Sequence, residues 1–94
     1  MRRLAWQASF RRAFKRRTRN RPALAKHILE TIASLAADPF APSLRIHRLS
    51  GELDGLWACA VEYDCRIVFA FEPDPEADED LIALIDVGTH DEVY

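Results

Sequence analysis

The apolar residues of this chain change their spacing after residue 43, and that change constrains the fold more than any other feature of the sequence. Before it, apolar residues recur every three or four positions, as on one face of a helix. After it, short β-rich runs are separated by turn residues, which indicates strands on short connections. Two helices followed by four strands predict an α+β domain, in which a helical hairpin packs on one face of a twisted antiparallel sheet.

The first half of the chain predicts a short strand at residues 3–6 and then two helices. Ser9 is the expected N-cap of a helix over residues 10–19, and Pro22 suits the first turn of a second helix that ends near residue 38. Each helix should bury one apolar face and leave the other face in water. The apolar positions are Phe10, Ala13 and Phe14 in the first helix and Leu24, Ile28, Ile32 and Leu35 in the second.

The second half predicts strands at residues 44–49, 56–62, 65–72 and 81–87. Tyr63 and Asp64 form the turn between the middle two strands, so paired residues have numbers that sum to about 127, and Cys59 should face residues near Val68. The acidic segment 72–80 is expected to be a solvated hairpin tip. Alternation along the third strand places three residues on the core face, namely Ile67, Phe69 and Phe71.

The length of 94 residues predicts a single domain over residues 1–94. No apolar run approaches the roughly 18–20 residues of a membrane-spanning helix, and the N-terminus lacks the apolar stretch of a signal peptide. We therefore expect a cytoplasmic protein with no membrane partner, in which Cys59 and Cys65 are reduced packing residues. Two cysteines six positions apart with no nearby histidine match no zinc site, so neither a metal nor a cofactor is expected.

Charge is divided unevenly along the chain. Ten of the thirteen basic residues precede Glu30, whereas the acidic residues concentrate in the second half. A cationic half on a small domain is the electrostatic footprint of a polyanion or an acidic partner, and the alternative is a solvated helix face. The candidate docking residues for such a partner are Arg11, Arg12, Lys15, Arg16, Arg17 and Arg19.

Two of the three histidines lie near predicted strand ends, where functional residues tend to collect. His47 precedes the turn at residues 50–55 and His90 follows the last strand, whereas His27 lies beside the apolar stripe of a helix and is expected to be structural. Two histidines, a carboxylate and an arginine can cleave RNA without a metal. One group takes the 2′-hydroxyl proton, another protonates the leaving 5′-oxygen, and a guanidinium stabilises the phosphate charge.

Three segments are the most specific motifs of the chain: HRLSGELDG, YDCRI and the terminal GTHDEVY. Together they resemble the RelE/ParE superfamily of bacterial toxins from type II toxin–antitoxin pairs, over most of the chain and most closely in its RelE-like and YafQ-like branch. The resemblance implies a ribosome-dependent mRNA endonuclease that needs no metal, arrests translation and leaves a 2′,3′-cyclic phosphate and a 5′-hydroxyl. It also implies a cognate antitoxin as partner and a toxin–antitoxin complex that binds operator DNA.

The resemblance carries roles to individual residues. His47, Asp64 and His90 match catalytic positions of YafQ-like toxins, and Arg66 matches a catalytic arginine of the wider superfamily. Tyr94 takes the place of a terminal aromatic that positions the RNA, so the chain end should fold onto the active face of the sheet. The alternative for this end is a packing tail with Val93 and Tyr94 in the core.

One position departs from the pattern, because Ala60 stands where YafQ-like toxins have a further active-site histidine. The assignment of acid and base therefore stays open, and so does a catalytically degenerate toxin that only binds its antitoxin. A ParE-like inhibitor of DNA gyrase is a further alternative, although such an inhibitor does not need the two histidines. For the nuclease, Arg45 and Arg48 are expected to contact the mRNA.

Overall fold

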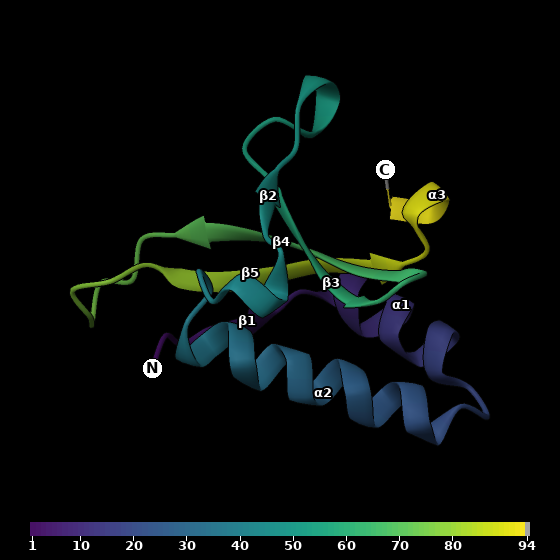
Figure 1. Ribbon diagram of the computed structural model, residues 1–94. Helices are drawn as coiled ribbons and strands as arrows, with labels where there is room; N and C mark the ends of the chain where they lie inside the picture. Colours follow the sequence, from purple (N-terminus) through teal and green to yellow (C-terminus); the bar gives the residue numbers. More distant parts are fainter. Residues whose placement is uncertain (94) are drawn as a thin grey trace.

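The elements, in chain order, are β1 (Leu4–Trp6), α1 (Ala8–Thr18), α2 (Pro22–Ala37), a 3₁₀ turn (Pro42–Leu44), β2 (His47–Arg48), a second 3₁₀ turn (Gly51–Leu53), β3 (Trp57–Glu62), β4 (Cys65–Glu72), β5 (Leu81–Gly88) and α3 (His90–Val93). This computed structural model describes residues 1–93, so the roles expected for Tyr94 lie outside the described residues. Figure 1 shows α1 and α2 as a helical layer on one face of a single sheet. No helix in the described part is long and apolar enough to cross a membrane.

The five strands form one sheet in the order β1-β5-β4-β3-β2. The expected α+β class, with two helices on one face, is confirmed. The sheet is mixed rather than purely antiparallel, because β1 pairs parallel with β5, with Leu4 opposite Ile82. Strands joined by a tight turn must run antiparallel. β1 and β5 are instead joined by the whole chain between them, which is long enough for the two strands to run parallel.

The main core lies between the helical layer and the sheet. Phe10 and Ile28 from the helices and Ile67 and Phe69 from β4 are fully buried (0% exposed). Phe71 is partly buried and packs against the same core, so the predicted core face of β4 is confirmed. Burial of each such large apolar side chain stabilises the fold by about 1.5–3 kcal/mol.

The start of α1 differs from the prediction. α1 begins at Ala8, so Ser9 lies in its first turn instead of capping it. The Ser9 hydroxyl donates a hydrogen bond to the Ile85 carbonyl at 2.6 Å and so ties α1 to β5. Just beyond the end of α1, Asn20 has a φ of 57°, a left-handed conformation that asparagine tolerates after a helix. The predicted break before Pro22 is therefore confirmed.

The strand predicted at residues 44–49 is much shorter in the structure. Pro42 begins a 3₁₀ turn, and Arg45 then takes a left-handed conformation with φ 50° and ψ 47°. Both features are incompatible with an extended ladder, so only His47 and Arg48 pair with β3.

The β3–β4 hairpin contains a bulge that shifts its register. Glu62 pairs with Cys65 next to the turn, as predicted, but Cys59 pairs with Ile67, one residue from its expected partner. The register shifts between Ala60 and Glu62, so the residue between them is an extra one that has no partner on β4. The prediction assumed an unbroken ladder and could not anticipate this shift.

A second, smaller apolar cluster lies on the face of the sheet away from α1 and α2. Its buried members are Leu49, Ala58, Val68 and Val93. Val93 belongs to α3 and is 8% exposed, so it holds this short helix against the sheet. Figure 1 shows α3 on the side of the sheet opposite the helical layer. We call this side the open face.

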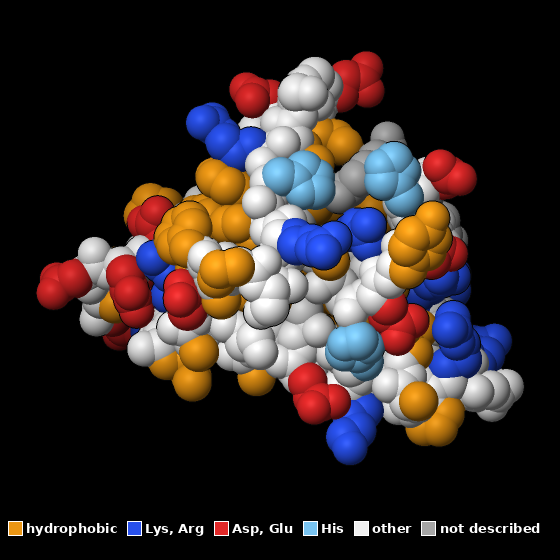
Figure 2. Space-filling model, viewed as in Figure 1, with side chains coloured by type: hydrophobic (Ala, Val, Ile, Leu, Met, Phe, Trp, Pro, Cys, Tyr) orange, Lys and Arg blue, Asp and Glu red, His pale blue; other side chains and the backbone are white. Residues whose placement is uncertain are grey.

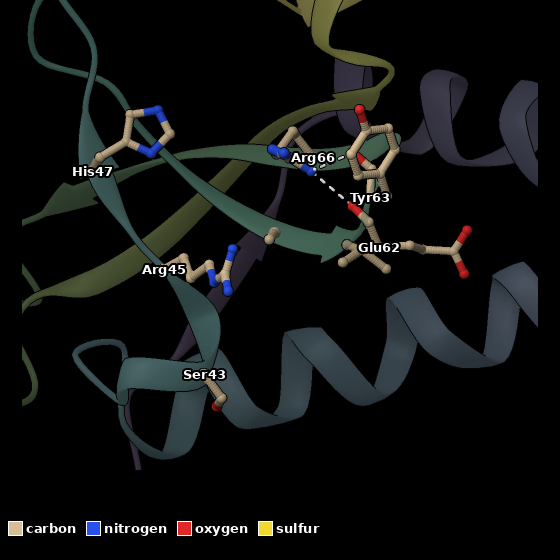
Figure 3. Close-up of a pocket in the computed structure, with 8 residues that line it drawn as sticks. Ser43, Arg45, His47, Glu62, Tyr63 and Arg66 are labelled. Atoms are coloured by element: carbon tan, nitrogen blue, oxygen red, sulfur yellow. Dashed lines mark hydrogen bonds between the residues drawn. The ribbon is translucent and has the colours of Figure 1, made fainter.

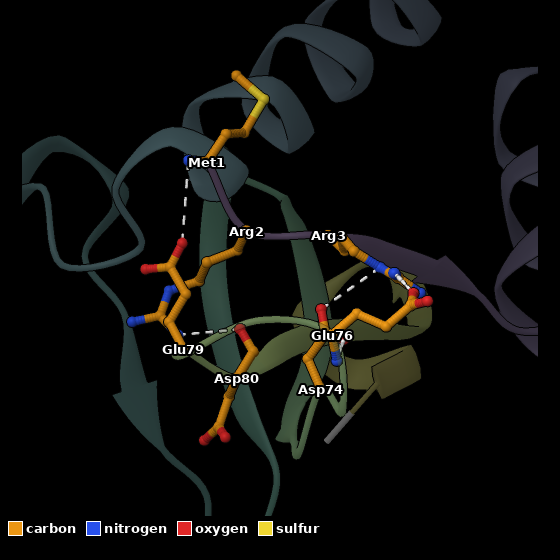
Figure 4. A network of polar contacts seen from close by, with 7 residues as sticks. All are labelled: Met1, Arg2, Arg3, Asp74, Glu76, Glu79 and Asp80. Atoms are coloured by element: carbon orange, nitrogen blue, oxygen red, sulfur yellow. Dashed lines mark hydrogen bonds and ion pairs between the residues drawn. The ribbon is translucent and has the colours of Figure 1, made fainter.

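The acidic connection between β4 and β5 is exposed at every residue of 72–80 except Asp74, so the predicted solvated tip is confirmed apart from that residue. The Asp74 side chain is 1% exposed, and Arg3 Nε lies 3.3 Å from its Oδ2. Arg3 also donates to Glu76, and Arg2 donates to the carbonyl of Asp80 at 3.0 Å (Figure 4). The hydrogen bond to Glu76 and the charge of Asp74 raise the pKa of Arg3. The cations of the first residues are thus largely compensated by this loop.

Candidate active site

The open face of the sheet carries the candidate catalytic residues. The register aligns one row across four strands, consisting of His47, Ala58, Val68 and Asp86. The neighbouring row consists of Ala60, Arg66 and Gly88. Because side chains alternate between the two faces of a sheet, His47 and Arg66 lie on the same face in neighbouring rows.

His47 lies between two cavities. One cavity of about 400 Å³ contains His47 together with Arg45 and Arg66. The other, of about 370 Å³, contains His47 together with Arg48 and His90. Figure 3 shows Arg45, His47 and Arg66 around the first cavity, with β2 on one side and the β3–β4 turn on the other. The structure therefore brings together two histidines and three arginines that the sequence places up to 45 positions apart.

The Arg66 side chain is tied to the β3–β4 turn. Its Nη1 donates to the carbonyls of Glu62, Tyr63 and Cys65 at 2.7, 3.1 and 3.3 Å. A guanidinium has five N–H donors in a fixed fork, so Nε and Nη2 remain able to bind an anion while Nη1 is held by the turn. This arrangement fixes the orientation of the guanidinium before any substrate binds.

Arg45 reaches the same cavity through an unusual backbone conformation. It is one of two non-glycine residues among 1–93 with a positive φ. A left-handed conformation costs about 1–2 kcal/mol for a residue with a Cβ, and here the Arg45 amide donates to the Pro42 carbonyl at 3.2 Å. Strained residues of this kind cluster at functional sites, where the surrounding structure over-determines them.

His90 is placed by α3. It is the first residue of this helix, and Val93 fixes the helix on the open face. The His90 Nδ1 lies 3.8 Å from the Asp91 carboxylate. The expectation that the chain end folds onto the active face agrees with this position, whereas the expected neighbour Tyr94 lies outside the described residues.

Asp64 is not brought into either cavity. It is exposed in the turn between β3 and β4 and lines neither the cavity with Arg66 nor the cavity with His90. Arg48 lies at the cavity with both histidines, and its guanidinium also lies 5.7 Å from the centre of the Trp57 ring. The structure therefore groups four of the expected residues with His47 and leaves Asp64 apart.

The basic residues at positions 11–19 lie on α1 and just after its end, and none of them lines either of the two cavities. Arg11, Arg12, Lys15, Arg16 and Arg19 are exposed, and Arg17 is half-buried. Figure 2 shows lysine and arginine side chains at the α1–α2 end of the molecule and histidines over β2 and α3. Two separate cationic surfaces therefore exist, one on α1 and one at the cavities.

His27 lies apart from the other two histidines. It is exposed on α2, and its Nδ1 lies 3.0 Å from Glu62 Oε2, so the pair links α2 to β3. His27 lines neither cavity that contains His47. This position agrees with the structural role expected for it.

Sequence analysis missed one prominent member of the site. Tyr63 lines the cavity of Arg45 and Arg66, although the sequence suggested only a turn residue there. The available signal was its chemistry, since two-residue turns usually carry small polar residues or glycine rather than a large aromatic ring.

The two cysteines are buried beneath the sheet, on the side of the main core. Burial raises the pKa of the Cys59 thiol to about 12 and that of the Cys65 thiol to about 11. Both are free thiols, so their expected role as packing residues agrees with the structure. Within residues 1–93, no three histidine, cysteine or acidic side chains come close enough to form a metal site.

Comparison with known proteins identifies one family along nearly the whole sequence. A family described as the bacterial toxin of type II toxin–antitoxin system, YafQ, matches residues 2–94. No curated protein matches the chain.

Several solved structures share the fold. A YoeB/ParE toxin from Agrobacterium tumefaciens superimposes with a TM-score of 0.76 at 20% identity, covering 94% of this chain and 98% of that chain. The E. coli DinJ–YafQ toxin–antitoxin complex gives a TM-score of 0.74 at 17% identity, with 99% and 97% covered. The RelBE2 toxin–antitoxin complex from Mycobacterium tuberculosis gives 0.69 at 16% identity, with 94% and 96% covered.

Proposed function

Because this chain belongs to the YafQ family of toxins from bacterial type II toxin–antitoxin systems, we propose that it is an endoribonuclease that cuts mRNA on the ribosome and thereby arrests translation. The observation that carries this proposal is the position of His47, which lies between a cavity with two arginines and a cavity with the second histidine. A protein that only had to bind a partner would not need this convergence of proton-transfer groups and cations.

The proposed reaction is an attack of the 2′-hydroxyl on the adjacent phosphorus. One imidazole, of His47 or His90, takes the hydroxyl proton, and the other gives a proton to the leaving 5′-oxygen. The O–P bond to the 2′-oxygen forms as the bond to the 5′-oxygen breaks, which leaves a 2′,3′-cyclic phosphate and a 5′-hydroxyl. Arg66 and Arg45 would hold the phosphate and stabilise its developing charge. Asp64, which lies outside both cavities, would act through the shape of the turn rather than on the reacting atoms.

The proposed partners occupy the two cationic surfaces. The mRNA would lie on the open face, and ribosomal RNA would meet the basic residues of α1, where phosphate contacts give affinity that depends on salt but not on sequence. The solved DinJ–YafQ and RelBE2 complexes contain an antitoxin, and we propose that a cognate antitoxin likewise neutralises this toxin. Operator binding by the resulting complex stays a prediction.

Primer extension on translated mRNA, with and without ribosomes, tests the proposed activity. His47→Ala and His90→Ala should each reduce cleavage by about 10²–10⁴, the usual scale for a lost general acid or base. His27→Ala is the matched control, because it removes an exposed histidine that lines neither cavity, and it should cut at the normal rate. A toxin without His47 and His90 that still cuts mRNA normally would refute the proposal.

Ala60 gives specific support to one alternative, a toxin that binds its antitoxin but no longer cuts. Ala60 lies directly opposite Arg66 on the open face and lines the same cavity as His47. A catalytic group expected there is therefore missing from the centre of the site. Growth arrest without any mRNA cleavage would favour an inhibitor of another target such as gyrase, and neither arrest nor cleavage would favour the degenerate toxin.

A further inference from the structure

Tyr63 is the most exposed large hydrophobic side chain among residues 1–93. It is 96% exposed, more than any of the other exposed large side chains, including Met1 at the chain end and Phe40 in a loop. Its ring stands at the tip of the β3–β4 turn, on the rim of the cavity that contains Arg45 and His47 (Figure 3). A large ring that gains nothing from burial in the free protein is suited to contact a ligand.

The backbone beneath this ring is held in place. The Arg66 Nη1 donates to the carbonyl of Tyr63 itself at 3.1 Å and to that of Glu62 at 2.7 Å. Below the turn, Glu62 pairs with Cys65 in the ladder. The position of the Tyr63 backbone is thus fixed relative to the guanidinium, so the ring is attached next to any ligand that binds Arg66 and can turn onto it.

The chemistry of the cavity indicates what that ligand is. Arg45 and Arg66 supply fixed positive charge for a phosphate, and the volume of about 400 Å³ is in the range of small-ligand sites, about 300–1000 Å³. An aromatic face beside a phosphate site is the usual platform for a base of single-stranded nucleic acid. Ser43 lines the cavity from the side of β2, and its hydroxyl can donate to or accept from a base edge.

We propose that Tyr63 forms a nucleobase subsite, in which its ring stacks on a base of the mRNA next to the phosphate held by Arg66. This inference rests on the proposed function and makes Tyr63 a substrate-binding residue in addition to those expected from the sequence. Stacking needs the ring and not the hydroxyl, so the subsite should accept any base. Arg66 then has two tasks, since it binds the phosphate and holds the turn that carries the stacking ring.

Binding of uncut mRNA to programmed ribosomes tests the subsite without depending on cleavage. The mRNA carries deoxyribose throughout the codon that awaits decoding, because removal of the attacking 2′-hydroxyl prevents the reaction. Tyr63→Ala should weaken toxin binding by roughly 5- to 150-fold, the factor that corresponds to one lost stacked base. Tyr63→Phe should bind like the wild type, and Phe40→Ala, which removes an exposed ring outside this cavity, is the matched control.

Single abasic nucleotides in the same codon identify the stacked base. At one position, the abasic nucleotide should weaken binding of the wild type by about the same factor as Tyr63→Ala weakens binding to intact mRNA. At that position the affinity of Tyr63→Ala should fall no further, because the two changes remove the same interaction. Equal binding by Tyr63→Ala and the wild type would overturn the subsite. It would also be overturned if the affinity losses from the abasic nucleotide and from Tyr63→Ala were additive at every position. A loss of antitoxin binding with unchanged mRNA binding would also overturn it and would assign the ring to the protein partner.

The endonuclease proposal is judged separately by primer extension on unmodified mRNA with the wild-type toxin. If the abasic nucleotide and Tyr63→Ala are non-additive in binding but the wild type does not cut mRNA, the subsite is retained and the nuclease is refuted. If the wild type cuts mRNA but the two changes are additive, only the subsite is refuted. Failure of the wild type to bind the programmed ribosome would overturn both.

Discussion

Replacement of Ala60 by histidine should increase the mRNA cleavage proposed for this toxin. Ala60 pairs with Arg66, and directly opposed Cβ atoms in an antiparallel pair lie about 4.5–5.5 Å apart. The neighbouring row of the open face contains His47, so an imidazole at position 60 would enter the cavity shared by His47, Arg45 and Arg66. Ala60→His would thus add a third proton-transfer group to the centre of the site.

The size of the gain follows from the space and charges around Ala60. The side chain lines a cavity of about 400 Å³, so the larger residue avoids the cost of overpacking, about 1–3 kcal/mol in a filled core. The new imidazole would share the cavity with the Arg45 and Arg66 guanidiniums, and nearby like charge disfavours its protonated form, so it would be able to act as a base. A positioned base contributes about 10²–10⁴. Because two histidines are already present, we expect a gain near the lower end of that range.

Primer extension on ribosome-bound mRNA measures the gain, and Ala60→Gln is the matched control. Glutamine has a similar size and hydrogen-bonding capacity but cannot exchange a proton near neutral pH. Both variants should melt close to the wild type, since substitutions at solvent-lined positions usually change stability by about 0.5 kcal/mol or less. If Ala60→His cuts no faster than Ala60→Gln, a side chain at position 60 does not reach the reacting atoms, and the proposed placement of the substrate is wrong.

Two further predictions concern the surfaces away from the site. Replacement of four exposed or half-exposed arginines of α1 by glutamine should weaken ribosome binding and flatten its salt dependence; the residues are Arg11, Arg12, Arg16 and Arg17. Co-sedimentation with ribosomes across a salt series measures both effects, and an unchanged salt slope would contradict the prediction. The thiols of Cys59 and Cys65 should not react with a thiol reagent at pH 8 until the protein is unfolded. Their folded pKa values of about 12 and about 11 exceed the unfolded value near 9, so their contribution to stability is complete below about pH 9 and is lost as the pH rises toward 11–12. Denaturant midpoints that stay constant between pH 8 and 11 would contradict this reasoning.

Local patterns were sufficient for some elements of the fold and insufficient for others. The two helices and the β3–β4 hairpin were predictable, because apolar spacing and turn residues act within a few positions of the chain. The parallel pairing of β1 with β5 was not, because it joins residues near 5 and 83 that no local pattern connects. The shortened β2 also escaped prediction, since the left-handed Arg45 after a 3₁₀ turn leaves no signature in an alternating sequence.

The candidate site shows the same division. Residue chemistry singled out His47, His90 and Arg66, but only the strand order could show that His47 belongs to two cavities at once. Asp64 illustrates the limit of a motif match, because it is in the expected turn and yet lines neither cavity. The turn that carries Asp64 instead presents Tyr63, whose role depends on its position relative to Arg66 and not on its place in the sequence.

The separation of the two cationic surfaces bears directly on how a ribosome-dependent nuclease of this size could work. The α1 cations line neither cavity, whereas Arg45, Arg48 and Arg66 do, so the two sets consist of different residues. Contacts of α1 with one RNA therefore leave the open face available for another. Arg2 and Arg3 belong to neither surface, because the β4–β5 connection supplies their partners. Under the proposed function, two sets of cations would let ribosomal RNA and mRNA bind at the same time, whereas a single cationic patch would make the two RNAs compete.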